Sequence, residues 1–365
     1  MKFTLFLVIF LYSFSVKAIH ITFVNPSISG YDFWDRVTYA FLDAAKDLNV
    51  NVEVLYGQDN RVFNHQKIVE ITNKAVKPDY VIFMPYSGNA KAAFDLLEEH
   101  EIPFITLERT LPTSEQQALG FPQQQYKYWL GELYHDNEYA GELLANTLIK
   151  AAKSAKNKPD KVYSAVGLMG TYGGESEHRV DGLEKSIATH ANIELLQTAP
   201  GFWNKEKSEI VFQQMIQRYT GTKIDIAWAA SDGMALGIAK IAEKYNSDGH
   251  IKIGGIDWTQ DAIKAINNGQ LTASVGGHFM QAAWALVRIF DHHNNKDVFL
   301  QGENKPTYQL EAITQENIQS HTFLMKKINW DNVDFKQYSL MFNDKNMHDF
   351  SVASFVDLFA KDALK

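Results

Sequence analysis

The chain of 365 residues contains no cysteine. Disulfides, thiolate metal sites and cysteine nucleophiles are therefore excluded, and ordinary apolar cores must hold the fold together. Basic residues are also few, with 35 Lys and Arg against 43 Asp and Glu and a formal net charge of −8. Because no basic cluster suited to a phosphate backbone is present, we expect no nucleic-acid partner. The length fits two domains of ordinary size.

Long apolar runs are absent beyond the amino terminus. There, Lys2 precedes an almost wholly apolar run over residues 3–14, and residues 16–18 end in a small alanine. This pattern is typical of a cleavable secretion signal over residues 1–18, and the run is short for a bilayer span. No Cys follows the run, so a lipoprotein anchor is not expected. An uncleaved anchor is the alternative to a mature periplasmic chain that begins near Ile19.

A strand–helix–strand pattern occurs twice in the sequence. The first copy covers residues 19–55 and the second covers residues 162–196, and each continues in further alternating strands and helices. Strands that are joined by single helices run parallel, because the crossover returns the chain to the same end of the sheet. We therefore predict an α/β protein of two similar, doubly wound, parallel-sheet lobes joined by a three-segment hinge.

The same alternation gives the predicted domain boundaries. The N-terminal lobe is expected at 19–135 plus 278–309, and the C-terminal lobe at 136–277 plus 310–323. The stretch 110–129 is interpreted as a long surface loop at the edge of the first lobe. Residues 324–365, which we name the C-terminal extension, are too rich in aromatic residues for a disordered tail. We expect this extension to pack on the body of the protein.

Candidate site residues follow the predicted strands. In open parallel sheets, ligands bind just beyond the carboxyl ends of the strands. Aromatic rings there can stack on the flat C–H face of a sugar, while its hydroxyls donate to carboxylates and accept from guanidinium groups. We therefore predict a small sugar or polyol ligand, with no metal, no cofactor and no catalytic residue. The predicted ligand-binding residues are Phe33, Trp34, Tyr86, Glu108, Arg109, Arg179, Trp203, Ser231 and Asp257.

Several of these residues have structural alternatives. Glu108 and Arg109 could pair only with each other at a strand end, and Asp257 could simply cap the helix that follows it. Phe33 and Trp34 could be ordinary core residues. A positive charge early in a helix is unfavourable against the helix dipole, so an arginine at the predicted start of a helix, residue 179, calls for a ligand or a carboxylate partner.

The motifs resemble those of the type I periplasmic sugar-binding proteins, which include ribose-binding and galactose-binding proteins. The resemblance covers about residues 19–314. It rests on Phe33-Trp34 and on the segments 102–109, 170–182, 230–237 and 254–258. It implies stacking rings at Phe33, Trp34 and Trp203, an acidic and basic pair at Glu108 and Arg109, and hydroxyl-binding groups at Arg179 and Asp257. It also implies a monomer that captures its ligand by hinge closure and delivers it to the membrane permease of an ABC transporter.

The chain departs from the ribose-binding pattern at three positions. Glu108 stands where Asp is usual, Ser231 where Asn is usual, and Gly277 where Gln or Arg is usual. The loop containing Phe33-Trp34 is also similar to that of the autoinducer-2 receptor branch. A sensory binding protein that presents its ligand state to a membrane kinase or cyclase is therefore an alternative function.

A glycoside hydrolase is the remote alternative, with Glu108 and Asp257 as its carboxylate pair. The sequence carries no Gly-x-Ser-x-Gly elbow, no His-Glu-x-x-His and no Walker phosphate loop. We therefore expect a binding protein and not an enzyme.

Overall fold

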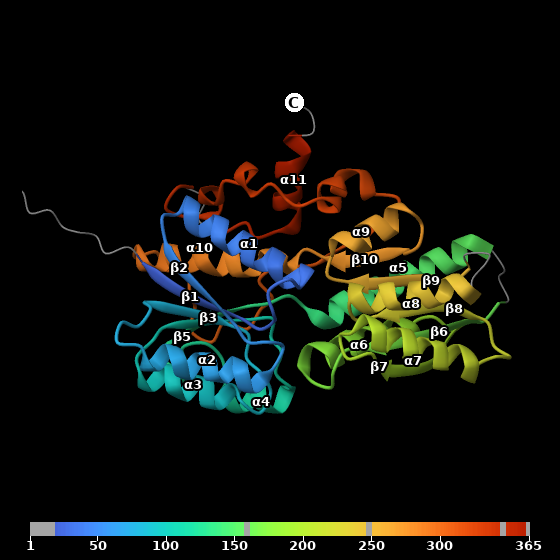
Figure 1. The fold of residues 1–365 in the computed structure, drawn as a ribbon, viewed down its shortest axis with the longest axis horizontal. Coiled ribbons are helices and arrows are strands. Elements are labelled where there is room, and N and C mark those ends of the chain that lie inside the picture. Colours follow the sequence, from blue (N-terminus) through green and yellow to red (C-terminus); the bar gives the residue numbers. More distant parts are fainter. Residues whose placement is uncertain (1–18, 157–160, 246–249, 344–347, 363–365) are drawn as a thin grey trace, which may run out of the picture.

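The computed structural model describes residues 19–156, 161–245, 250–343 and 348–362. Two β-sheets lie side by side, each covered by helices on both faces (Figure 1). The predicted secretion signal lies outside the described residues. Within these ranges, no helix combines the length and the apolar composition that a membrane crossing requires.

The first sheet has five strands in the order β2-β1-β3-β4-β5, and all of its pairs are parallel. Helices α1 and α10 pack together on one face, and α2 and α3 pack together on the other. We call this unit the first lobe. Its elements are β1 (His20–Asn25), α1 (Asp32–Asp47), β2 (Asn51–Tyr56), α2 (Arg61–Asn73), β3 (Tyr80–Phe83), α3 (Ala90–Glu99), β4 (Phe104–Leu107), α4 (Thr113–Leu119), β5 (Trp129–Leu133) and α10 (Gln281–His293).

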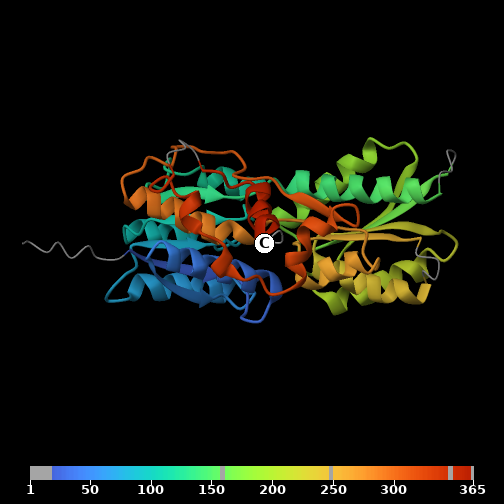
Figure 2. The ribbon, with the colours of Figure 1, turned by 90° about the horizontal axis from the view of Figure 1, so that it is seen from above.

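The second sheet has six strands in the order β11-β10-β9-β8-β6-β7. Helices α5 and α6 cover one face, and α7, α8 and α9 cover the other (Figure 2). We call this unit the second lobe. Its elements are α5 (Asn137–Lys156), β6 (Tyr163–Met169), α6 (Gly174–Ala188), β7 (Ile193–Pro200), α7 (Lys205–Arg218), β8 (Ile224–Ala229), α8 (Asp232–Tyr245), β9 (Lys252–Ile256), α9 (Gln260–Asn267), β10 (Ala273–Gly276) and β11 (Glu311–Thr314).

The two predicted α/β lobes are confirmed, with one difference in the second sheet. The edge strand β11 runs antiparallel to β10, with Ala273 opposite Thr314. This strand follows a long connection from the first lobe and not a single crossover helix, so the rule that enforces parallel pairing does not apply to it.

The prediction that residues 110–129 form a surface loop is wrong. This stretch contains helix α4 and leads directly into β5, an edge strand of the first sheet. Trp129 and Leu119 are buried in an apolar cluster with Phe94 and Phe104, between the sheet and helices α2 and α3. A helix of seven residues is too short to show a clear apolar period, and its Gln-rich sequence hid it.

The chain passes between the lobes three times. It enters the second lobe between β5 and α5, returns between β10 and α10, and crosses again before β11. A short 3₁₀-helix, η1 (His278–Met280), follows the second crossing. His135 forms an isolated parallel bridge with Tyr308, so the first and third crossings lie side by side.

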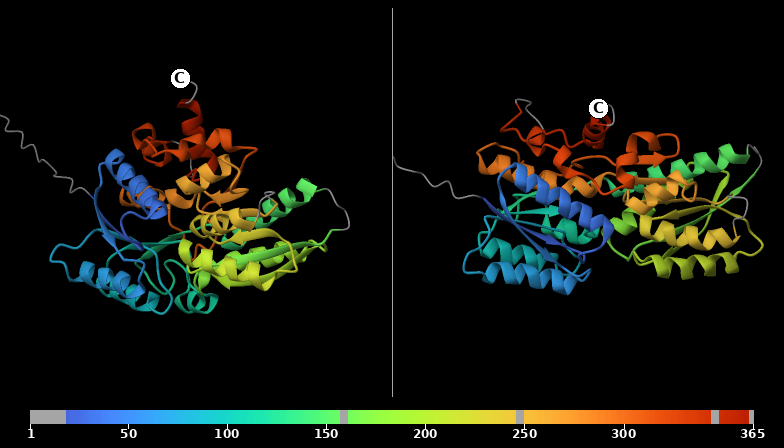
Figure 3. Two further views of the ribbon diagram at one scale, coloured as in Figure 1. Left: turned by 45° about the vertical axis from the view of Figure 1, so that its right-hand side comes forward. Right: turned by 45° about the horizontal axis from the view of Figure 1, so that its top comes forward.

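The C-terminal extension lies across both lobes (Figures 2 and 3). It begins at the end of 3₁₀-helix η2 (Ile318–Met325) and contains η3 (Trp330–Asn332), η4 (Phe335–Tyr338) and α11 (Val352–Asp362). The backbone N–H of Phe335 donates to Asp47 of α1 at 2.8 Å, and the Gln260 side chain of α9 donates to the carbonyl of Met325 at 2.9 Å. The extension is thus bonded to each lobe.

Gly277 lies under the extension at the second crossing. Its φ is +118°, and a Cβ atom there would lie 2.4 Å from a methyl group of Val352 in α11. A larger residue at position 277 would therefore require the extension to move. This contact gives a physical reason for glycine at position 277, where the ribose-binding pattern has a Gln or an Arg.

Candidate functional site

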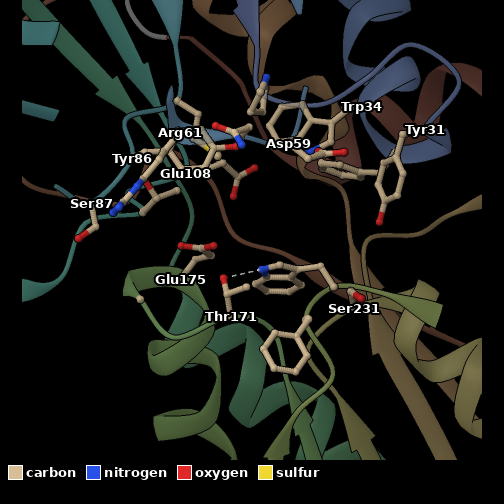
Figure 4. Close-up of a pocket in the computed structure, with 18 of the residues that line it drawn as sticks. Tyr31, Trp34, Asp59, Arg61, Tyr86, Ser87, Glu108, Thr171, Glu175 and Ser231 are labelled. Carbon is tan, nitrogen blue, oxygen red and sulfur yellow. Dashed lines mark hydrogen bonds between the residues drawn. The ribbon is translucent and has the colours of Figure 1, made fainter. Parts of the chain in front are cut away.

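A cavity of about 830 Å³ lies between the two lobes at the carboxyl ends of their strands (Figure 4). Its first-lobe wall follows β1 to β4, and its second-lobe wall follows β6 to β10. This volume is within the range of small-molecule sites. The lining includes Tyr31, Phe33, Trp34, Asp59, Arg61, Tyr86, Glu108, Glu175, Arg179, Trp203, Ser231, Asp257 and His278.

Most of the residues predicted from the strand ends line this one cavity. They are Phe33, Trp34, Tyr86, Glu108, Arg179, Trp203, Ser231 and Asp257. The rule that ligand groups gather at the carboxyl ends of parallel strands therefore located the cavity without any family knowledge.

Arg109 does not line this cavity. Its guanidinium donates to the Glu132 carboxylate, with Nε at 2.7 Å, and lies over the Tyr134 ring at 3.5 Å. Glu108 and Arg109 form a turn directly after β4, with positive φ values of 75° and 50°, and their side chains have different partners, Gln281 for Glu108 and Glu132 for Arg109. The prediction that Arg109 lines the ligand cavity together with Glu108 is therefore wrong. Arg109 pairs with a buried carboxylate on β5, that of Glu132, and lines a separate, smaller pocket.

Arg179 is fixed at the floor of the cavity by the second lobe. It is 4% exposed, and its Nε donates to Oδ1 of Asn137 while Nη1 donates to the carbonyl of Ala230, both at 2.8 Å. The same Nη1 lies 3.9 Å from Oδ1 of Asp257. The two short bonds of Arg179 use only some of its five N–H donors, so further donors can reach a ligand beside Asp257.

Asp257 lies on a turn with unusual backbone geometry. Its φ is +137° and that of Trp258 is +58°, values that non-glycine residues rarely adopt. The carboxylate lies 3.4 Å from Nε2 of His278. Helix α9 is capped by Thr259, so the alternative role of Asp257 as the cap is excluded.

Asp232 supports this turn from below. It is fully buried, and it accepts from the Thr259 N–H at 2.8 Å and from the Ser274 hydroxyl at 2.7 Å. Burial and the neighbouring Asp257 raise the pKa of the Asp232 carboxyl. Burial likewise raises the pKa of Asp257, and Arg179 opposes that shift.

Glu108 faces the cavity from the end of β4. Its Oε1 accepts from the amide of Gln281, and its Oε2 lies 4.0 Å from Nδ1 of His135. Burial lowers the pKa of His278 to about 4 and that of His135 well below its usual value. Both imidazoles are therefore neutral at pH 7, and neither supplies a counter-charge to Glu108.

Aromatic rings line both sides of the cavity. Phe33 packs edge-on against Trp34 at 5.2 Å between centroids and lies 4.5 Å from the His278 ring. On the second lobe, Trp203 donates from Nε1 to Thr171 at 3.2 Å and lies 5.7 Å from Arg179. A Cβ at Gly170 would lie 2.0 Å from the Trp203 ring, so only glycine leaves room for that ring.

Sequence reasoning missed the contribution of the β2–α2 loop. Asp59, Asn60 and Arg61 all line the cavity and are exposed. They follow the carboxyl end of β2, so the same strand-end rule, applied to that strand, would have found them. The sequence signal for this loop is the run of turn-forming and charged residues Gly57–Arg61 directly after an apolar strand.

Glu175 and Tyr31 are further cavity residues outside the predicted set. Glu175, in the first turn of α6, faces Glu108 and Tyr86 across the cavity (Figure 4). Burial raises the pKa of Glu175 to about 7, with Glu108 adding to the shift. Burial also raises the pKa values of Tyr31 and Tyr86, so both hydroxyls stay protonated at neutral pH and are able to donate.

This arrangement suits recognition of a neutral, hydroxyl-rich molecule. Rings from both lobes offer flat apolar surfaces, and carboxylates with a guanidinium offer paired acceptors and donors between them. Among the described residues, no group of three or more His, Asp or Glu side chains forms a metal site. The fold and the cavity define a two-lobe solute-binding protein.

Comparison with known proteins agrees with this class. The family model described as periplasmic binding protein domain matches residues 21–297. The chain is 23% identical to the ribose import binding protein of Escherichia coli over 232 residues, covering 63% of this chain and 70% of that protein. It is 25% identical to a fructose import binding protein of Bifidobacterium longum, covering 64% and 65%.

Solved structures show the same fold. A periplasmic sugar-binding protein from Pseudomonas fluorescens superposes with a TM-score of 0.78 at 24% identity, covering 92% of this chain and 98% of that one. A solute-binding protein from Actinobacillus succinogenes with bound D-allose gives 0.71 at 19% identity, covering 82% and 99%. The chain belongs to the periplasmic binding protein family, in its type I sugar-binding branch, which consists of binding proteins and not of enzymes.

Proposed function

We propose that the chain is an exported solute-binding protein that captures a small sugar or polyol between its lobes and delivers it to the permease of an ABC transporter. One observation carries the proposal. Phe33 and Trp34 of the first lobe share a single cavity with Arg179 and Asp257 of the second. A ligand that contacts both sets stabilises the closed arrangement of the lobes, and the three crossings act as the hinge.

The relatives support this ligand class. Their names record import of ribose and fructose, and one is a D-allose-binding periplasmic protein. Similar folds have been solved with D-allose and with myo-inositol bound. We infer that residues 1–18 direct the chain to the periplasm, where it works as a monomer.

Titration calorimetry against pentoses, hexoses and polyols tests the proposal, using the mature chain from Ile19. Hydrogen bonds to charged groups contribute about 1.5–3 kcal/mol each, so a few of them with two stacked rings give a dissociation constant of about 1 μM. At least one sugar or polyol should bind at this level and raise the melting temperature. If every compound gives neither heat nor a melting shift, the proposal fails.

A sensory role is the second candidate. It is favoured by the C-terminal extension, which lies outside the matched family segment and contacts both lobes. A surface that spans both lobes changes shape when they rotate, and a membrane kinase or cyclase could read that change. Uptake of labelled sugar by cells lacking the protein separates the roles, because a transport protein is needed for uptake and a sensor is not.

A further inference from the structure

Helix α1 is bonded directly to the second lobe at its amino-terminal end. Arg36, which is 6% exposed, donates from Nη1 to the carbonyl of Trp258 at 2.8 Å and from Nη2 to the carbonyl of Leu324 at 3.1 Å. Its Nε lies 3.4 Å from Oδ1 of Asp32, one helical turn earlier. The other carboxylate oxygen of Asp32 accepts from the backbone N–H of Gln260, the first residue of α9, at 2.9 Å.

These bonds connect the two halves of the ligand cavity. Phe33 and Trp34 lie between Asp32 and Arg36 in the chain and line the cavity from the first lobe. The Trp258 carbonyl follows Asp257, which lines it from the second lobe. The pair Asp32–Arg36 therefore joins the stacking rings to the turn that carries the carboxylate, although neither residue lines the cavity itself.

The turn needs this support because its backbone is held in a rarely populated conformation. Positive φ values at two successive non-glycine residues cost about 1–3 kcal/mol each and persist only where surrounding contacts impose them. On the second-lobe side, Ser274 and Asp232 supply such contacts. From the first lobe, Arg36 holds the Trp258 carbonyl.

We propose that Arg36 and Asp32 are positioning residues for ligand binding, which fix the Asp257–Trp258 turn against helix α1 and keep this edge of the cleft together while the opposite edge opens. The inference rests on the proposed sugar-binding function. The bond from Arg36 to the carbonyl of Leu324 also fixes the start of the C-terminal extension against helix α1.

The variant Arg36→Gln tests the proposal, with Arg288→Gln as its matched control. Arg288 is also a buried arginine, and it bonds to the carbonyl of Val298 and, at 2.9 Å, to the carboxylate of Glu303. Neither of these partners lines the cavity. A merely structural role predicts that both variants lower the melting temperature and that neither changes sugar affinity.

The positioning role predicts a different result. Arg36→Gln should weaken binding of the sugar found by calorimetry about tenfold or more, while Arg288→Gln should stay within about twofold of the unmodified chain. Asp32→Ala, whose side chain is half exposed, is the second variant and should give a smaller loss in the same direction without threatening the fold. Unchanged affinity in both Arg36→Gln and Asp32→Ala would overturn the proposal.

Hydrogen exchange of the ligand-free chain separates this inference from the proposed function. Arg36→Gln should speed exchange of the backbone amides at 257–263, because the Trp258 carbonyl loses its first-lobe donor and Asp32, which accepts from the Gln260 N–H, loses the guanidinium beside it. Arg288→Gln should leave those amides unchanged. If the unmodified chain binds no sugar, the proposed function fails, and the exchange comparison still decides the positioning role. Equal exchange at 257–263 in all three proteins would overturn it.

Discussion

Asp257, a proposed ligand-binding residue, combines unusual backbone geometry with a place in the cavity lining. It lies on a turn with positive φ, is buried beside Arg179, and its carboxylate opens onto the cavity. Burial raises the pKa of Asp257. A ligand hydroxyl that donates a hydrogen bond to the carboxylate would lower this pKa again, because it stabilises the ionised form. We therefore expect loss of this carboxylate to be among the changes that weaken binding most.

Asp257→Asn should lower sugar affinity by about 1.5–3 kcal/mol, or roughly tenfold to a hundredfold, because charge-assisted hydrogen bonds to the ligand are lost. Asp261→Asn, four residues later on the exposed side of α9, is the control and should bind normally. Calorimetry with the three proteins makes the comparison. Equal affinity in Asp257→Asn and the control would exclude Asp257 from the binding set.

Glu175 predicts a pH dependence of binding. Its carboxyl has a pKa of about 7 in the ligand-free chain and is thus partly protonated at neutral pH. Since a carboxylate accepts ligand hydroxyls more strongly than a neutral acid does, affinity should rise as the pH increases from 6 to 8. Glu175→Gln should make this profile less steep, and the slope that remains belongs to Asp257, because burial raises the pKa of that carboxyl as well. An equally steep profile in the variant would assign the titration to another group.

At the residue scale, the strand-end rule identified most of the cavity and failed where side-chain direction matters. Glu108 and Arg109 are neighbours in sequence, and only the three-dimensional path of the chain shows that one faces the cavity while the other pairs with Glu132. Asp59 and Arg61 lie outside the predicted set because exposed polar residues after a strand are also typical of an ordinary surface turn.

Among the elements, the crossings between the lobes, which form the proposed hinge, include two buried histidines. His278 and His135 lie 4.8 Å apart between ring centroids, and each has a buried Nδ1 without a hydrogen-bond partner among the described residues. Burial lowers the pKa of His278 to about 4, whereas an unfolded histidine titrates near 6.5. The unfolded chain therefore binds protons in this interval while the folded chain does not.

It follows that stability is fully present above pH 6.5 and falls as the pH decreases from 6.5 toward 4. The His278→Gln variant should lose less of its free energy of unfolding over this interval, by roughly 2–3 kcal/mol. Urea unfolding at pH 7 and pH 4.5 measures the difference. His293→Gln, at an exposed position, is the control, and an identical pH response in both variants would contradict the assignment.

The C-terminal extension should contribute to stability through its buried rings. Phe355 in α11 is 1% exposed and packs against Phe279 of η1 at 5.2 Å, whereas Phe342 is 56% exposed. Phe355→Ala should cost about 3–5 kcal/mol of unfolding free energy, and Phe342→Ala well under 1 kcal/mol. Urea titration checks both values. Similar small losses in the two variants would mean that α11 is not part of the folded core.

The elements that the sequence predicted well are those with long apolar periods. In α1, the apolar positions Val37, Phe41, Ala44 and Ala45 are all buried as the helical spacing indicates. The stretch 110–129 gave no such period, because its buried residues are spread over a seven-residue helix, turns and the start of β5. That this stretch belongs to the core follows only from its packing against Phe94 and Phe104 in the folded structure.

For the whole molecule, the repeated strand–helix–strand pattern was enough to predict two facing α/β lobes. It was not enough to predict the antiparallel strand β11 or the path of the C-terminal extension. Both depend on contacts between segments far apart in sequence, such as the bond from Phe335 to Asp47. Such contacts produce no periodic pattern of apolar residues along the chain, so they cannot be predicted from the sequence.

The proposed function requires that one ligand is enclosed by both lobes. The most direct test is the distance between spin labels on the two lobes, measured with and without the sugar found by calorimetry. Ala92 of α3 and Ile210 of α7 are exposed, so Ala92→Cys and Ile210→Cys can each carry a spin label. Because the chain has no native cysteine, no other residue is labelled. We predict a shorter, narrower distance distribution that saturates at the calorimetric affinity. Sugar binding with an unchanged distribution would show that the ligand does not bring the two lobes together.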